Sequence, residues 1–426
     1  MNVEHTQQTQ RRWKVPFFAI WTGQAASLLG SNLVQFALVW WLTTTTGSAT
    51  VLATATLVAM LPGIFVGPFA GALVDRWNRR VVMMVADGVI ALATVGLAYL
   101  FAVGAMRVWY VYAIVFIRAT AGGFHWPAMQ ASTSLMVPEQ HLSRVAGLNQ
   151  TLNGVMNIMS PPLGALLLAI LPTQSILAID VGTAALAIAP LFFVHIPQPE
   201  RSAAATRSKP SLWGDVREGL RYIWGWPGML ALLFMATVIN FLFNPAFSLL
   251  PILVTKHFGG EALELGWIES AWGIGVVLGG LILSVWGGFR RRILSTLMGL
   301  AGMGLGALVI GLTPATAFWL ALGAMFFAGC MHPITNGPIL AIIQAIVTPE
   351  MQGRVFTVIQ SLASAMSPLS LAIAGPVADL LGVRTWYVIA GVVCALMGGG
   401  AFFVPAIVHL EDNHREAGKG MPVHFD

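Results

Sequence analysis

Long apolar runs alternate with short polar segments along almost the whole chain. Each run reaches about 20 residues, which is the length that an α-helix needs to cross the hydrocarbon core of a bilayer. The runs lack the period-two alternation of membrane-spanning β-strands, so the pattern predicts helices. The twelve expected helices cover residues 17–42, 49–74, 81–103, 109–136, 145–171, 175–194, 229–254, 265–285, 293–312, 315–346, 355–381 and 386–408.

Composition places the chain among integral membrane proteins. Hydrophobic residues make up 57% of it and charged residues 9%, whereas soluble domains carry about 25% charged residues. The first apolar run is far longer than the core of a secretory signal, and no small-residue cleavage site follows it, so we expect it to be retained. The sequence therefore predicts an all-α integral membrane protein.

The longest polar stretch divides the chain nearly in half. Its last part, residues 215–224, has the pattern of an amphipathic helix that lies on the membrane surface. The expected organisation is an N-terminal six-helix bundle, a cytoplasmic linker with this surface helix, a C-terminal six-helix bundle and a cytoplasmic tail. These parts cover residues 1–195, 196–227, 228–410 and 411–426.

Lysine and arginine predict the orientation of the helices. If the N-terminus is cytoplasmic, 18 of the 22 Lys and Arg residues lie on that side, Arg107, Lys256 and Arg384 lie on the other, and Arg118 lies within an expected helix. This bias predicts that both termini are cytoplasmic. It also accounts for the net charge of +5, so no nucleic-acid partner is expected. Both cysteines lie within expected helices, which argues against a disulfide framework.

The two halves of the chain repeat each other at a nearly constant offset. Gly63, Gly67, Arg79 and Arg80 recur 212 residues later, and Pro127 recurs after 211 residues. Such a series of matches indicates a duplicated six-helix unit with the same topology in both copies. The expected fold is therefore twelve transmembrane helices in two pseudo-symmetric six-helix bundles.

A short charged cluster follows the second expected helix. Gly71 is followed after three apolar residues by Asp75 and Arg76, and then by Arg79 and Arg80. This spacing resembles the loop signature of the major facilitator superfamily, whose fold has twelve helices in two six-helix repeats. Further stretches resemble the group of drug/proton antiporters that contains macrolide-efflux and enterobactin-exporter-like proteins. These stretches are residues 137–144, 179–180, 217–222 and 375–379.

The resemblance implies a role for this cluster in gating. Gly67 and Gly71 lie four residues apart on one helix face, which would let a neighbouring backbone approach closely. In the family, the acid that corresponds to Asp75 meets the N-terminal end of helix eleven, near Arg354 here, and helps to close the cytoplasmic gate. A plain positive-inside loop with a helix-capping acid is the alternative. The expected gating residues are Gly67, Gly71, Asp75, Arg76, Arg79 and Arg80.

Ionisable residues within the expected helices are candidates for coupling, because each is costly in lipid. Arg118, with Gly122 four residues later, resembles a family signature whose arginine is implicated in proton transfer or substrate binding. Glu269 and Asp379 lie in helices that line the cleft of this fold, and either could take up a proton. His125 could shuttle protons near neutral pH, although a buried neutral histidine is the commoner case.

Two further acids, Asp87 and Asp180, lie in helices that are peripheral supports in this fold, so packing or pairing is the role expected for them. The segment with Ser160, Pro161 and Gly164 resembles part of the antiporter signature of helix five, although Ser160 stands where that signature has glycine. This match favours export by antiport.

Amide and aromatic side chains predict a neutral polar wall around a cleft. Such a wall suits a bulky amphipathic molecule better than a sugar or a small ion, although amide stripes can equally hold helices together. The candidate residues are Gln35, Trp126, Asn149, Asn153, Asn157, Asn240, Asn244 and Trp272.

No phosphate-binding loop, metal-ligand spacing or hydrolase nucleophile motif is found, so neither an enzyme nor a cofactor or metal is expected. The sequence instead predicts a monomeric secondary transporter of the inner or plasma membrane. Its expected activity is proton-coupled export of hydrophobic or amphipathic compounds, such as macrolide-like drugs or siderophores, by rocking of the two bundles. Two alternatives stay open: a facilitator or importer of lipid-like or other small molecules, and a non-transporting receptor or assembly factor.

Overall fold

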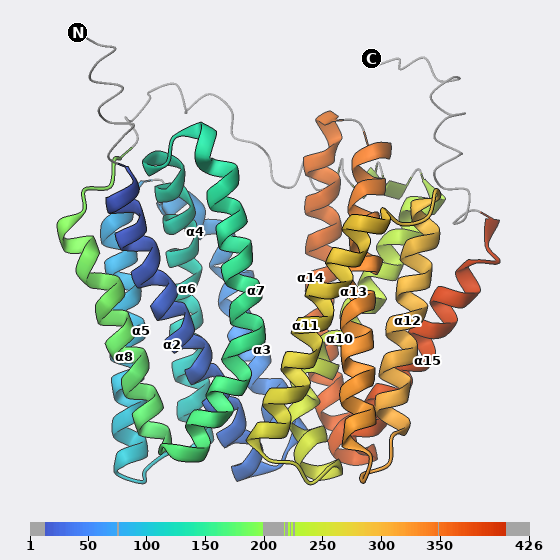
Figure 1. The fold of residues 1–426 in the computed structure, drawn as a ribbon, viewed down its shortest axis with the longest axis horizontal. Helices are drawn as coiled ribbons and strands as arrows, with labels where there is room; N and C mark the ends of the chain where they lie inside the picture. Colours follow the sequence, from blue (N-terminus) through green and yellow to red (C-terminus); the bar gives the residue numbers. More distant parts are fainter. Residues whose placement is uncertain are drawn as a thin grey trace. The chain divides into compact units, whose positions relative to one another are not determined.

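A computed structural model describes residues 13–74, 76–198, 217, 220–221, 223–224, 226–347 and 349–405. Within these residues the regular structure is helical throughout (Figure 1). The first half contains α2 (Lys14–Thr46), α3 (Ala49–Phe65), α4 (Gly67–Val74), α5 (Arg79–Ala102), α6 (Val108–Met136), α7 (Glu139–Ile170) and α8 (Thr173–Phe193). The second half contains α10 (Pro227–Ile252), the short π-helix η2 (Leu253–His257), α11 (Ala262–Trp286), α12 (Arg292–Leu312), α13 (Phe318–Ile346), α14 (Pro349–Leu381) and α15 (Val383–Ala401).

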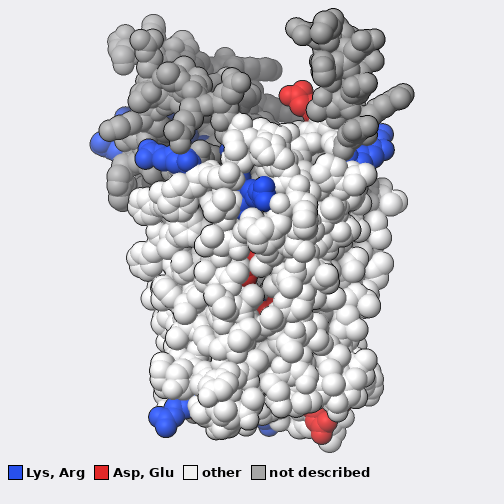
Figure 2. Space-filling model, turned by 90° about the vertical axis from the view of Figure 1, so that its left-hand side faces the viewer, with Lys and Arg blue, Asp and Glu red and all other residues white. Residues whose placement is uncertain are grey.

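The lengths and hydropathy of these helices suit a multi-pass membrane protein. Among the described residues, 10 helices are long and apolar enough to cross a membrane. α6 is not one of the 10, but its 29 residues exceed the length that a crossing needs. Figure 2 shows a wide belt on one face that is nearly free of charged side chains apart from a few acidic atoms near its centre, with Lys and Arg along its upper margin and a few charged side chains at its lower margin.

The second expected helix is divided into two, which corrects the prediction of one helix over residues 49–74. α3 has 17 residues and ends at Phe65, and α4 begins at Gly67. Pro62 lies inside α3 and Pro68 follows the break. Each proline lacks the backbone N–H of a regular helical hydrogen bond, and glycine adds little helix propensity, so the break falls in this segment.

The chain divides into two compact units. Unit 1 contains residues 1–47, 54–203 and 261–266, and unit 2 contains residues 48–53, 204–260 and 267–426. Within unit 1, α2 packs against α7 and α8, and α5 packs against α6 and α8. Within unit 2, α10 packs against α14 and α15, and α12 packs against α13 and α15. The same pairs of helices therefore pack together in the two halves.

Close helix packing within unit 1 depends on two glycines of α2. A Cβ atom at Gly23 of α2 would lie 2.7 Å from the carbonyl oxygen of Leu186, and one at Gly30 would lie 3.0 Å from the Cα atom of Asp180. These glycines let α2 approach α8. In contrast, a Cβ atom at Gly67 or Gly71 would meet no described atom within 4 Å. The close approach expected at Gly67 and Gly71 therefore stays a prediction.

The expected surface helix of residues 215–224 lies largely outside the described residues. In its described part, the side chain of Ile223 is fully buried in a cluster with Met229 and Val355, and Leu220 packs against the same cluster. Arg221 and Trp224 are exposed. The segment therefore has one side that packs in the cluster, with Leu220 and Ile223, and another that is exposed, with Arg221 and Trp224. This division is the one expected of an amphipathic segment.

Candidate functional site

A polar cavity of about 400 Å³ lies inside unit 1. It is lined by α2, α3, α5, α6 and α7, and its wall contains few charges. Trp21 and Trp126 supply aromatic surface, and Asp87, Arg118 and His125 are its ionisable residues. The amide and hydroxyl groups of the wall come from Gln24, Ser27, Ser31, Asn32, Gln35, Gln130, Asn149 and Asn153.

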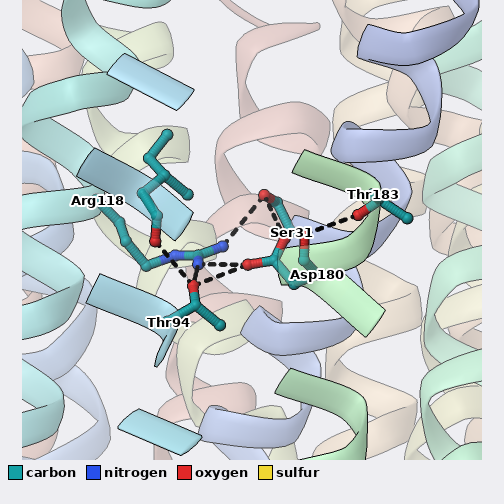
Figure 3. Close-up of polar contacts among 6 residues, drawn as sticks. Ser31, Thr94, Arg118, Asp180 and Thr183 are labelled. Carbon is teal, nitrogen blue, oxygen red and sulfur yellow. Dashed lines mark hydrogen bonds and ion pairs between the residues drawn. The ribbon is translucent and has the colours of Figure 1, made fainter. Parts of the chain in front are cut away.

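Arg118 forms a buried ion pair beside this cavity (Figure 3). Its Nη1 atom lies 2.7 Å from Oδ2 of Asp180, whose side chain is fully buried. The hydroxyl of Thr94 lies 2.8 Å from the same oxygen, and the hydroxyl of Ser31 donates to Oδ1 at 3.1 Å. Nη1 of Arg118 also contacts the Thr94 hydroxyl, and Nη2 donates to Ser31 at 3.1 Å. The network therefore joins α2, α5, α6 and α8 and gives Asp180 a complete set of partners.

A second ionisable group contains Asp87 of α5 and His125 of α6. Oδ2 of Asp87 accepts a hydrogen bond of 2.8 Å from the Gln24 amide, and Oδ1 lies 3.3 Å from Nε2 of His125. Nε2 is buried and makes no hydrogen bond of regular geometry to the described residues. Asp87 is 4% exposed. Its described contacts are therefore one neutral donor and one imidazole.

Most of the sequence candidates in the first half meet at this cavity. Gln35, Trp126, Asn149 and Asn153 line it together with Arg118 and His125. Asn149 also accepts a hydrogen bond of 2.8 Å from the indole of Trp21, which links α7 to α2. Asn157 is exposed on α7 and is not part of the wall.

The sequence did not reveal the hydroxyl partners of the ion pair. Ser31 and Thr94 are small polar residues within long apolar helices, and neither position carries a motif. Their roles follow from the rotation of α2 and α5 toward α6 and α8. Asp180 has the pairing role that was expected for it.

Of the two amide candidates on α10, Asn244 joins this helix to α14, whereas the hydrogen bonds of Asn240 lie within α10. Asn244 donates to Oδ1 of Asn240 at 3.2 Å and to the hydroxyl of Ser367 on α14 at 2.7 Å. Asn240 donates to the carbonyl of Ala236 one turn earlier. Trp272 packs edge to face against Phe247, with ring centroids 4.5 Å apart.

The two acidic candidates of the second half lie in different surroundings. Glu269 lies on α11, where its side chain is partly buried. The carboxylate of Asp379 accepts hydrogen bonds from the Ser48 hydroxyl at 2.8 Å and from the backbone N–H groups of Ala49 and Thr50 at 2.7 and 3.0 Å. Asp379 therefore binds the N-terminal end of α3, where a helix favours negative charge.

Asp75 lies outside the described residues, but its neighbours show how the charged cluster is held. Asn78 caps α5, because its side chain accepts from the backbone N–H groups of Arg80 at 3.1 Å and Val81 at 3.4 Å. Arg79 donates to the carbonyl of Ala131 on α6 at 3.3 Å, and Arg80 donates to Phe192 at the end of α8 at 2.6 Å. Arg76 is exposed.

The antiporter-like segment lies where α7 packs against α2. Ser160 is buried, and Pro161 lies inside the helix. A Cβ atom at Gly164 would lie 2.9 Å from the Phe36 ring.

Among the described residues, no group of three or more His, Cys, Asp and Glu side chains could hold a metal ion.

Comparison with known proteins identifies relatives over nearly the whole chain. Residues 20–370 and 232–421 match the family described as Major Facilitator Superfamily. Macrolide efflux protein A of Streptococcus pyogenes is 34% identical over 379 residues, which are 89% of this chain and 93% of that protein. Multidrug efflux pump Tap of Mycolicibacterium fortuitum is 29% identical over 398 residues, which are 90% of this chain and 94% of the pump.

Solved structures with the same fold are more distant in sequence. A mutant of the nucleoside transporter NupG superposes with a TM-score of 0.69 at 13% identity, over 91% of this chain and 98% of that one. A bacterial homolog of the human lysosomal transporter Spinster also gives a TM-score of 0.69, at 12% identity over 96% of this chain and 99% of that one. At these identities, the likeness concerns the fold alone.

Proposed function

Because the chain belongs to the major facilitator superfamily, we propose that this multi-pass membrane transporter exports hydrophobic or amphipathic compounds, such as macrolide-like drugs or siderophores. The cavity of unit 1 carries this proposal. Its wall combines two indole rings with neutral amides and hydroxyls, which can bind a large, weakly polar molecule without a dense set of charges. The similarity to proteins named for macrolide and multidrug efflux supports the same class of substrate and the same direction.

Proton antiport is the energy source that we propose. The ionisable side chains Asp87, Arg118 and His125 line the cavity that would bind the substrate, so protonation and binding can influence each other. Alternating access by rocking of the two six-helix bundles would couple the inward movement of protons to the outward movement of the substrate. We further propose that the transporter is a monomer of the inner or plasma membrane with both termini in the cytoplasm.

The test is uptake of radiolabelled erythromycin, a macrolide, into inverted membrane vesicles that contain the protein. An exporter driven by protons accumulates the compound when the vesicle lumen is acidic, and an uncoupler abolishes the accumulation. Equilibration that is independent of the gradient would favour the facilitator, and the absence of movement for every compound tested would favour the receptor. Vesicles without the protein provide the background.

The charged cluster around Asp75 is proposed to form part of the cytoplasmic gate. Arg79 and Arg80 support this proposal because they fix the start of α5 to α6 and α8, so the cluster adjoins a firmly packed part of unit 1. Asp75→Asn should reduce erythromycin uptake at least tenfold while the protein stays in the membrane at its normal level. Glu139→Gln, an exposed acid at the start of α7, is the matched control. Equal uptake by both variants would contradict the gating role.

A further inference from the structure

The two ionisable groups in the cavity wall differ in how their charges are balanced. Asp180 contacts a guanidinium nitrogen at 2.7 Å and two hydroxyls, so its negative charge is matched by Arg118. Asp87 has a neutral amide donor at 2.8 Å and an imidazole nitrogen at 3.3 Å. An arginine stays protonated in proteins, whereas an imidazole gains and loses its proton near neutral pH.

This difference determines which group can carry a proton. An uncompensated carboxylate within the membrane is costly, so Asp87 is stable when a proton resides on its carboxyl group or on His125. Both arrangements contain the same single proton and have no net charge. Loss of that proton leaves one negative charge on the pair. Protonation of Asp180 would instead leave the Arg118 cation, whose side chain is only 13% exposed, without its acidic partner, which is unfavourable.

We propose that the Asp87 and His125 pair holds the proton that this transporter exchanges for its substrate, while the Arg118 and Asp180 pair stays ionised throughout. This inference rests on the proposed antiport function. Asp87 is the acceptor, and His125 connects it to the cavity because its side chain is 18% exposed, compared with 5% for Asp87. One proton can serve both side chains, because Oδ1 of Asp87 and Nε2 of His125 lie 3.3 Å apart.

The surroundings of the pair contain few other charges. From α6, the charged or titratable neighbours in the cavity wall are Arg118 and His125 itself, and from α8 the nearby acid is Asp180, which Arg118 neutralises. The wall residues of α2, α3 and α7 are uncharged. A change of charge at Asp87 is therefore the main electrostatic change available inside this cavity.

The position of the pair explains how substrate and proton would compete. Gln24 and His125, the two contacts of Asp87, both line the cavity. A molecule that binds there can displace the Gln24 amide from Asp87 or cover His125. Binding therefore changes the stability of the bound proton, and by reciprocity the proton changes the affinity for the substrate.

Proton release on substrate binding tests this proposal with the purified full-length protein. Erythromycin is added to the protein in weakly buffered detergent solution that contains a pH indicator. The wild type should release up to one proton per bound molecule, and its affinity should fall about tenfold for each pH unit below the midpoint of its pH profile. Asp87→Asn should release no proton and bind with an affinity that does not vary with pH. Glu139→Gln should behave as the wild type.

A second variant, His125→Gln, and uptake into inverted vesicles provide two further tests. If Asp87→Asn does not fold, His125→Gln should displace the midpoint of the pH profile, and an unchanged profile would overturn the proposal. In inverted vesicles, a wild type that needs no proton gradient contradicts the proposed antiport itself. If uptake by the wild type and by the Asp87→Asn variant both depend on the proton gradient, the antiport proposal stands and this inference alone is contradicted. The coupling residue would then be sought at Glu269 or Asp379.

Discussion

At the residue scale, the buried ion pair shows how this chain tolerates charge within a membrane segment. Asp180 is fully buried, yet each of its oxygens has a donor, and Arg118 supplies the opposite charge. A buried pair of this kind contributes little net stability over apolar residues, but the loss of one partner leaves an unpaired charge. The protein should therefore lose stability when one of the two residues is replaced, and lose much less when both are replaced together by neutral residues.

Asp180→Asn should destabilise the protein by about 3–5 kcal/mol, because it leaves the guanidinium of Arg118 buried without a counter-charge. Replacement of both residues, Arg118→Gln with Asp180→Asn, should recover much of this loss. Thermal unfolding of the purified protein in detergent measures both effects. A double variant that is less stable than either single variant would show that the two positions do not act as an ion pair.

Asn78→Ala should destabilise the protein by about 1 kcal/mol, because the backbone N–H groups of Arg80 and Val81 lose their side-chain acceptor. Asn78→Asp keeps an acceptor at the positive end of α5 and should unfold at the wild-type temperature or above. The same unfolding measurement compares the three proteins. Equal melting temperatures for Asn78→Ala and the wild type would exclude a capping role.

At the element scale, the contact between α2 and α8 depends on the absence of side chains. Gly30 lies against the backbone of Asp180 and the side chain of Thr183, and Gly23 lies against Leu186. This contact also places Ser31 beside the Asp180 carboxylate. The same close contact between α2 and α8 is therefore needed both for helix packing and for assembly of the ion-pair network.

Gly30→Ala should cost about 1–3 kcal/mol, because the added methyl group overlaps α8 and forces the two helices apart. Gly96→Ala on α5 is the matched control, since a Cβ atom there meets no described atom within 4 Å. Melting temperatures of the two variants in detergent test the contrast. Similar melting temperatures would show that α2 and α8 do not need this close contact.

At the scale of the whole molecule, the distribution of Lys and Arg predicts one orientation in the membrane. Arg76 follows α4, Arg107 precedes α6, and both side chains are exposed. The crossing by α5 separates the two positions. The two positions are therefore expected to lie on opposite sides of the membrane, and chemical labelling can show which side each one faces.

Arg107→Cys should react with a membrane-impermeant maleimide in intact cells, whereas Arg76→Cys should react only in inverted vesicles. The native Cys330 and Cys394 are buried, so their background labelling should be low. Mass spectrometry of the labelled protein identifies the modified position. The reverse labelling pattern would place the N-terminus outside the cell and contradict the proposed direction of export.

The sequence by itself determined the class of the protein, the positions of nearly all helices and the family. These properties depend on the length of apolar runs and on the spacing of charged residues, both of which are local in the chain. The same information placed Arg118, His125 and the first-half amides among the candidates. It failed at residues 49–74, where two prolines and two glycines together end a helix that hydropathy alone would continue.

The tertiary structure decided which of these residues meet. A helix that is apolar on nearly all sides does not show in its sequence which face turns toward a neighbour. The pairing of Arg118 with Asp180 joins residues 62 positions apart, and that of Asp87 with Gln24 spans 63 positions. Both depend on how the helices are rotated and packed. The cavity exists because α2, α5, α6 and α7 turn their sparse polar side chains toward one another, which is a property of the packed bundle and not of any single segment.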